Sequence, residues 1–158
     1  MKAQHWLVAA VVGICGIALC GAYAAGRASA TQDKAPMRLT RIYASADGQS
    51  HAEDVDVKFG VADALGLMQS EALSSGSVNF VRFPPNFLET WHHAHARRFV
   101  ITLSGKGEIE LSDGHKVALE AGHVLLTEDL TGKGHIARAL TADWTALFVQ
   151  LADAEKGQ

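Results

Sequence analysis

The densest cluster of chemically active side chains comprises three histidines within four residues. They are His92, His93 and His95, preceded by Trp91 and followed closely by Arg98. Imidazole is the commonest protein ligand for zinc and also binds iron, nickel and copper. Alternate side chains of an extended strand share a face, so His93 and His95 are expected to point together and His92 away, unless a bulge intervenes.

A fourth histidine, His135, follows the glycine-containing loop 131–134 and is expected to arrive from a separate strand. Histidines from two strands would form an open metal site with room for water or a substrate. The expected ion is a divalent Fe, Mn, Ni or Zn. The alternative is that these histidines are solvated or hydrogen-bonded residues near the mouth of a barrel, with no metal.

Three further residues are candidates for contact with a substrate. An inward-facing Arg98 would bind a carboxylate or phosphate through paired hydrogen bonds, whereas Arg97 is expected to cap a strand or pair with Glu89. Glu128 would act as a ligand or general base, or would only shape a turn. Trp91 would form the wall or the rim of a pocket.

Short runs of apolar residues separated by glycine turns predict the strands that must position this cluster. They cover residues 38–43, 53–59, 77–83, 99–103, 108–111, 117–119, 123–127, 135–140 and 144–151. Asp113-Gly114 is a strong hairpin signal, and 61–75 is expected to be a loop or a short helix. The pattern predicts an all-β protein, built as an antiparallel sandwich or barrel.

From about Met37 to Leu151 the chain resembles the cupin superfamily, and most closely its small single-domain bacterial members of unassigned activity. The resemblance lies in residues 91–92, 97–105, 109–114, 121–129 and 131–135. It implies an antiparallel double-stranded β-helix, or jelly-roll barrel, of six to ten strands that holds one small ligand. Cupins of similar build include metal-dependent oxygenases, isomerases and epimerases.

The cupin metal motifs are only partly matched. Arg98 stands where the first motif has its metal-binding glutamate, and an arginine cannot ligate a metal. In the second motif Glu128 replaces a proline, and His135 comes two residues late. One interpretation is therefore a metal-binding cupin that uses His92, His93, His95 and His135, with an unassigned reaction. A second is a non-catalytic cupin that binds a small anion through Arg98 and the histidines, and a third is a structural dimer module.

The charge composition limits the classes of molecule that this protein is expected to bind. The 158 residues carry a formal net charge of −3 and no basic tract, which argues against nucleic-acid binding. A small-molecule ligand is the expected partner. Related barrels pair through edge strands, so a homodimer is also expected.

The first thirty residues predict export. Lys2 precedes an apolar run over 7–25 and the sequence Ala28-Ser29-Ala30, which is typical of a secretory signal peptide. The alternatives are an N-terminal membrane tether through 7–26 or a lipid on Cys15 or Cys20. The expected organisation is a leader over 1–30, a linker over 31–36, a cupin domain over 37–152 and a disordered tail over 153–158. The domain is expected to be periplasmic or secreted, or else anchored and facing outward.

Export with cleavage predicts a mature chain that begins at Thr31. Intact-mass measurement of the protein recovered from the cell envelope or medium should therefore show the loss of residues 1–30. The mass of the whole 158-residue chain in that fraction would contradict cleavage and favour the anchor.

Overall fold

The structure, a computed structural model, describes residues 36–152, and their regular secondary structure consists of β-strands. The ten strands are β1 (Arg38–Ala44), β2 (Ser50–Asp56), β3 (Ser75–Arg82), β4 (Leu88–His92), β5 (Arg98–Ser104), β6 (Lys106–Leu111), β7 (Lys116–Glu120), β8 (Val124–Glu128), β9 (His135–Ala139) and β10 (Thr145–Leu151). Between residues 36 and 152 there is no helix of the length and apolarity needed to cross a membrane.

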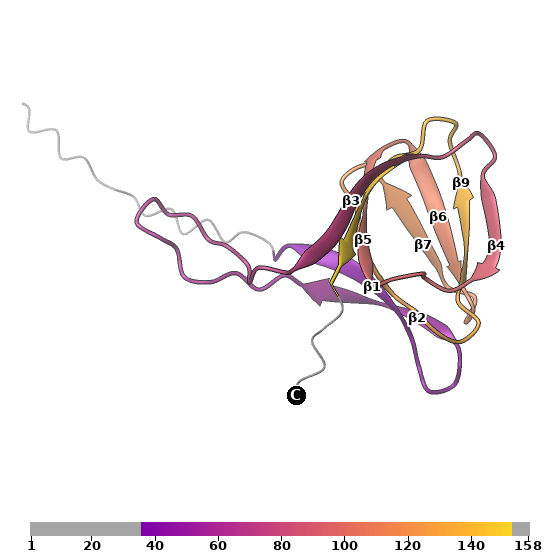
Figure 1. The fold of residues 1–158 in the computed structure, drawn as a ribbon, viewed down its shortest axis with the longest axis horizontal. Helices are drawn as coiled ribbons and strands as arrows, with labels where there is room; N and C mark the ends of the chain where they lie inside the picture. The colour runs from indigo at the N-terminus through magenta and orange to yellow at the C-terminus, as the bar shows by residue number, and fades with distance from the viewer. Residues whose placement is uncertain (1–35, 153–158) are drawn as a thin grey trace, which may run out of the picture. The chain divides into compact units, whose positions relative to one another are not determined.

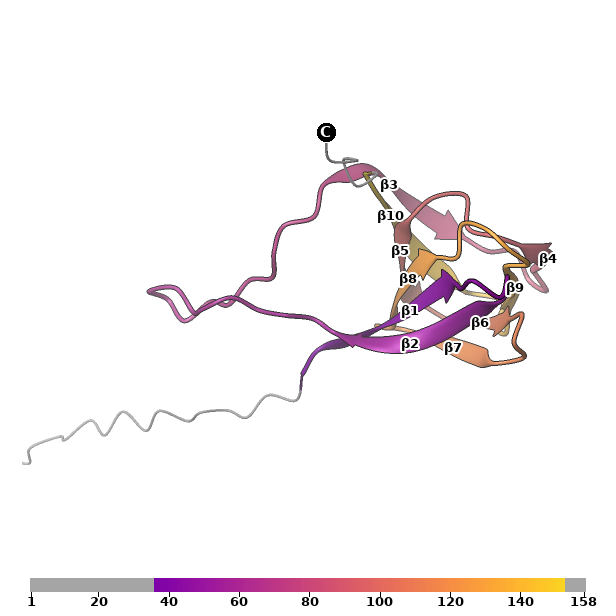
Figure 2. The ribbon, with the colours of Figure 1, turned by 90° about the horizontal axis from the view of Figure 1, so that it is seen from below.

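Eight of the strands form a ribbon folded about one hairpin. β6 pairs with β7, and moving outward along the chain β5 pairs with β8, β4 with β9 and β3 with β10, each pair antiparallel. Successive pairs alternate between two sheets, of order β2-β1-β8-β5-β10-β3 and β4-β9-β6-β7 (Figures 1 and 2). This is the winding of a jelly roll. The predicted all-β fold of two sheets is confirmed.

The structure departs from the expected pattern at three places. β1 runs parallel to β8, so the six-stranded sheet is mixed and not purely antiparallel. A short hairpin would force these two strands to run antiparallel. The connection between them is long, so a parallel arrangement is possible. The second strand lies at Ser50–Asp56, earlier than the predicted 53–59, and β4 was not among the predicted strands. Residues 61–74 form a loop, one of the two predicted alternatives for 61–75, and β3 begins at Ser75.

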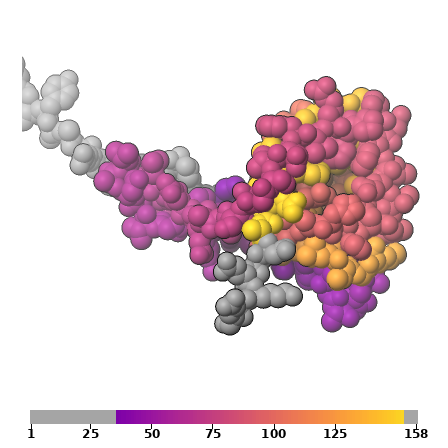
Figure 3. Space-filling view, viewed as in Figure 1, coloured from indigo at the N-terminus to yellow at the C-terminus, as the bar shows by residue number. Residues whose placement is uncertain are grey.

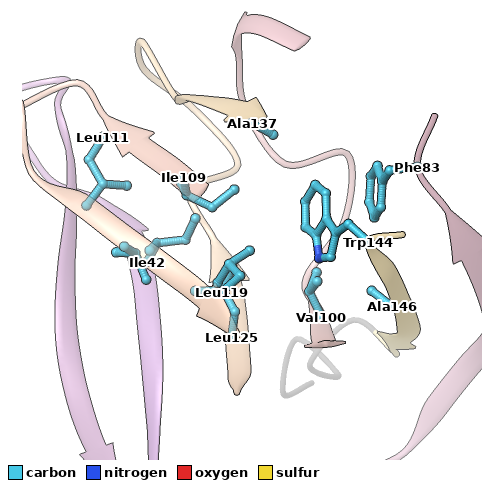
Figure 4. Packing of buried hydrophobic residues seen from close by; sticks show 11 residues of the cluster. Ile42, Phe83, Val100, Ile109, Leu111, Leu119, Leu125, Ala137, Trp144 and Ala146 are labelled. Carbon is cyan, nitrogen blue, oxygen red and sulfur yellow. The ribbon is translucent and has the colours of Figure 1, made fainter. Parts of the chain in front are cut away.

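The core lies between the two sheets and is divided into aliphatic and aromatic parts (Figure 4). Trp144 is buried and stacks on Phe83, with ring centroids 3.7 Å apart and an interplanar angle of 12°. Ile42, Leu119 and Leu125 fill the aliphatic part. β6 and β7 alternate buried and exposed residues, as expected for strands with one face on a core.

One glycine sets the fit around the tryptophan. A Cβ on Gly107 would lie 2.4 Å from the Trp144 indole, a buried ring that is stacked on Phe83. Gly107→Ala is therefore expected to lower the free energy of unfolding by about 1–3 kcal/mol through overpacking. Gly76→Ala is the control, because a Cβ there meets nothing within 4 Å. Urea unfolding of both variants checks this, and equal stability of the two would contradict it.

Candidate functional site

A small cavity of about 80 Å³ lies between the two sheets. Most of its lining is aromatic or aliphatic, from core residues such as Phe83, Trp144 and Phe148. Its polar lining consists of Glu89, His92, Arg98, Thr127 and His135. An apolar cavity with a few convergent polar groups is the usual form of a small-molecule site.

His92 and His135 face each other across the pairing of β4 and β9, and their ring centroids are 4.4 Å apart. The register of this pairing shifts between Glu89 and His92. Such a bulge puts side chains three residues apart on one face of the strand. Consequently Glu89 Oε2 lies 3.3 Å from His92 Nε2, and both residues line the cavity.

Both imidazoles are oriented through their Nδ1 atoms. His135 Nδ1 lies 2.5 Å from Asp129 Oδ2, and Asp129 is fully buried. His92 Nδ1 lies 2.9 Å from the carbonyl of Thr90, which only accepts, so His92 carries its proton on Nδ1. Burial lowers the pKa of His92, which favours the neutral ring. This arrangement leaves the Nε2 lone pair of His92 as an acceptor.

Gly134 allows the two histidine strands to approach. Its φ is +73°, and a Cβ there would lie 2.0 Å from the carbonyl oxygen of His92. Only glycine tolerates both conditions. The Ser50 hydroxyl donates a 2.6 Å hydrogen bond to the Gly134 carbonyl and ties this loop to β2. The position of His135 therefore depends on contacts from three separate parts of the chain.

Arg98 is the positively charged side chain in the lining of the cavity. Its guanidinium carbon lies 4.3 Å from the centroid of the Phe148 ring. Its Nε atom is buried, with no hydrogen-bond partner among residues 36–152. Burial lowers the pKa of Arg98 from its usual value, but an arginine remains charged in proteins. Arg98 thus presents a charged donor that the described residues do not satisfy.

The other histidines of the cluster are arranged differently from the expected alternation. β4 ends at His92, and residues 93–97 form a bend, so His93 and His95 do not share a strand face. The buried Ala94 donates its N–H to the Asp129 carbonyl, which turns the chain here. Both His93 and His95 are exposed, and the His95 ring lies 6.4 Å from His92.

Trp91 and Glu128 lie outside the cavity lining. Trp91 is exposed, and the Lys133 ammonium lies 4.2 Å from its ring centroid. Glu128 forms ion pairs with Arg41 and Arg97 and lines a groove on the outer side of the six-stranded sheet. The expected pairing of Arg97 with Glu89 is thus wrong, because Arg97 forms its ion pair with Glu128 instead.

Between residues 36 and 152, no three His, Cys, Asp or Glu side chains form a group that could hold a metal ion. His92 and His135 supply two oriented donors, and the charge of Arg98 in the same cavity opposes a cation. Sequence reasoning noted that Asp129 flanks the loop before His135 but chose Glu128 as the site carboxylate, and it missed the inward position of Glu89. Asp129 stands beside a glycine loop, where a carboxylate is normally part of a turn, and nothing in the sequence marks the bulge that turns Glu89 inward.

No family model and no curated protein matches this chain. Several solved structures are similar, among them the following two. The protein NMB1881 from Neisseria meningitidis has 12% identity and a TM-score of 0.38, over 48% of this chain and 72% of that one. A protein of Salmonella typhimurium described as ethanolamine utilization protein Q has 15% identity and a TM-score of 0.37, over 75% and 98%. At these values neither likeness assigns a family or a function.

The buried contact of Asp129 with His135 yields a stability prediction. Asp129→Ala leaves the buried His135 Nδ1–H without an acceptor, so the free energy of unfolding should fall by about 1–3 kcal/mol. Asp143→Ala, at an exposed turn position, should change it by less than about 0.5 kcal/mol. Denaturant titration measures both, and an Asp129→Ala variant as stable as the control would show that the pair contributes nothing.

The ion pairs of Glu128 yield a pH prediction. Burial raises the pKa of this carboxyl, but the hydrogen bonds from Arg97 and Arg41 outweigh burial and hold the pKa below 4.5. The ionised form therefore stabilises the fold above about pH 4.5, and this contribution is lost as the pH falls through the lowered pKa. In Glu128→Gln, stability should depend less on pH in this acidic range, as measured by thermal unfolding. Asp143→Asn, at an exposed turn position, should keep the wild-type dependence, and an unchanged profile for Glu128→Gln would refute the assignment.

Proposed function

We propose that this chain is an exported cupin-type barrel that binds a small organic anion in the cavity between its sheets. The observation that carries the proposal is the buried Nε of Arg98, which has no partner among the described residues. An unsatisfied buried donor costs about 1–3 kcal/mol, and more when it is charged. A carboxylate satisfies an arginine through paired, charge-assisted hydrogen bonds.

The volume of the cavity limits the size of this anion. A cavity needs at least about 10–15 Å³ to hold one water molecule, so a cavity of about 80 Å³ holds at most roughly five to eight. A ligand that replaces these waters has a similar number of non-hydrogen atoms. This favours a short carboxylic acid over a nucleotide or a sugar.

The histidine pair adds a second requirement. With its proton on Nδ1, the Nε2 atom of His92 is an acceptor, and it lies 3.3 Å from the Glu89 carboxylate, which also only accepts, so this corner of the cavity lacks a donor. A ligand hydroxyl would donate to this atom while its carboxylate meets Arg98. The proposed ligand class is therefore a short hydroxy acid, and the apolar wall from Phe83 to Phe148 excludes water from the remainder of the cavity.

A second candidate function is divalent-metal binding, and the orientation of the two imidazoles favours it. Histidine ligands commonly donate their second ring N–H to a carboxylate or a carbonyl, as His135 and His92 do to Asp129 and Thr90. His92 and His135 would supply two ligands to the ion, and water or a substrate would complete its coordination, because no third His, Cys, Asp or Glu of residues 36–152 joins them in a metal-binding group. His93 and His95 were also predicted as metal ligands, but both are exposed and neither lines the cavity. A bound ion would supply Lewis-acid chemistry for an unassigned reaction.

Ligand-induced stabilisation tests the anion proposal. A ligand that binds only the folded state raises the melting temperature in a concentration-dependent way. We expect this shift from lactate, glycolate or a hydroxy acid of similar size, and we expect it to disappear in Arg98→Gln. Arg38→Gln, a change at an exposed arginine far from the cavity, is the control and should keep the shift. If no short carboxylate shifts the wild type, or if Arg98→Gln responds equally, the proposal is wrong.

Elemental analysis of untagged protein tests the metal candidate separately. The expected result is about one divalent ion per chain, lost in His92→Ala and in His135→Ala. His115→Ala is the control, because His115 is exposed and does not line the cavity. Wild-type protein without metal after growth in supplemented medium, or equal metal content in all variants, would exclude this candidate.

A further inference from the structure

The outer face of the six-stranded sheet is apolar, although it points away from the core. Phe99 and Ile101 on β5 and Val124 and Leu126 on β8 all line a groove of about 1230 Å³ on this face. Their neighbours in sequence, such as Val100 and Leu125, fill the inner face. These strands are therefore apolar on both sides, as is typical of sheets that are covered on both faces.

An equally apolar segment lies next to this groove. We call residues 57–74, between β2 and β3, the arm; they run out from the two sheets (Figures 1, 2 and 3). The arm is held by few contacts, among them a single bridge from Phe59 to Ser70 and the turn at Asp63. Its large apolar side chains are therefore open to solvent: Val61 is 96% exposed and Leu65 is 84% exposed.

Exposure of large apolar side chains continues beyond the arm. Seven residues over 61–80 are more than half exposed, namely Val61, Leu65, Leu67, Met68, Leu73, Val78 and Phe80. At roughly 100 Å² each they offer on the order of 700 Å², close to the 800 Å² or so per partner of a standard protein interface. Monomeric proteins rarely leave a contiguous patch of this size open to water.

We propose that a second copy of this chain covers this face, with the arm of each copy lying in the groove of the other. One chain carries both halves of the contact, an apolar arm and an apolar groove, so a twofold arrangement buries both at once. No partner of another sequence is needed to match them.

Charge supports a second copy as the occupant. The arm carries Asp63, Glu71 and, at its start, Lys58, and no Lys or Arg occurs from residue 59 to 81. In contrast, the groove outside the arm is lined by two arginines, Arg41 and Arg97, against one carboxylate, Glu128. An acidic arm thus meets a groove of net positive charge in the other copy. The same lack of basic residues disfavours an anionic lipid surface as the partner of the arm.

Sedimentation equilibrium of the protein at micromolar concentration tests the exchange of arms. We expect a mass of two chains for the wild type and of one chain for the double variant Val61→Asp, Leu65→Asp. Because both side chains are almost fully exposed, the variant should keep the wild-type far-ultraviolet circular dichroism. Leu88→Asp is the matched control, since Leu88 is 60% exposed but lies on β4 of the other sheet, and it should remain dimeric.

Three results would overturn the proposal. The first is a wild-type protein with the mass of a single chain. The second is an arm variant that stays dimeric, since association through the leader or another surface survives these changes. The third is a monomer whose arm binds phosphatidylcholine vesicles, which would make a membrane the occupant of the exposed face.

Discussion

The hydrogen bond between Asp129 and His135 is the contact on which the arrangement of the cavity depends. A buried carboxylate is strongly destabilising without a partner, and His135 Nδ1 is the partner of Asp129 Oδ2, whereas Oδ1 has none among the described residues. The bond closes the loop after β8 onto the start of β9, and the Asp129 carbonyl also holds the bend after β4 through Ala94. One residue thus links the ends of β4, β8 and β9, and places the two imidazoles within 4.4 Å.

The winding of the chain follows from local signals that sequence reasoning can use. The Asp113-Gly114 turn predicts the central hairpin, and Gly114 has the positive φ that such a turn requires. Once β6 and β7 pair, the neighbouring strands on each side come together as the next pair, so the predicted runs over 99–103 and 123–127 become partners. β4 could not be predicted in this way, because its residues are largely polar and a bulge interrupts their alternation.

The site was only partly predictable for the same reason. The residue types of the 92–95 cluster drew attention to histidine, but alternation within one strand would pair His93 with His95. The bend after His92 breaks that alternation, and the structure instead pairs His92 with His135 from β9. Such a pair is a property of tertiary register, which no local spacing encodes. Arg98 was identified because it stands where the cupin motif has its metal-binding glutamate, and the structure places it on the same face of β5 as the buried Val100.

The two faces of β5 connect the cavity with the outer surface. Its apolar run from Phe99 to Leu103 predicts a strand buried on both sides, yet within the described chain only Val100 and Thr102 are buried. Hydrophobic patterning reflects the environment of the functional state, so an apolar face that the fold leaves open indicates a contact outside the chain. Arg98 begins this strand and faces the cavity, while Phe99 faces the groove. Cover on the outer face would therefore restrain the strand that holds the proposed anion-binding arginine, and would make the cavity more rigid without contacting it.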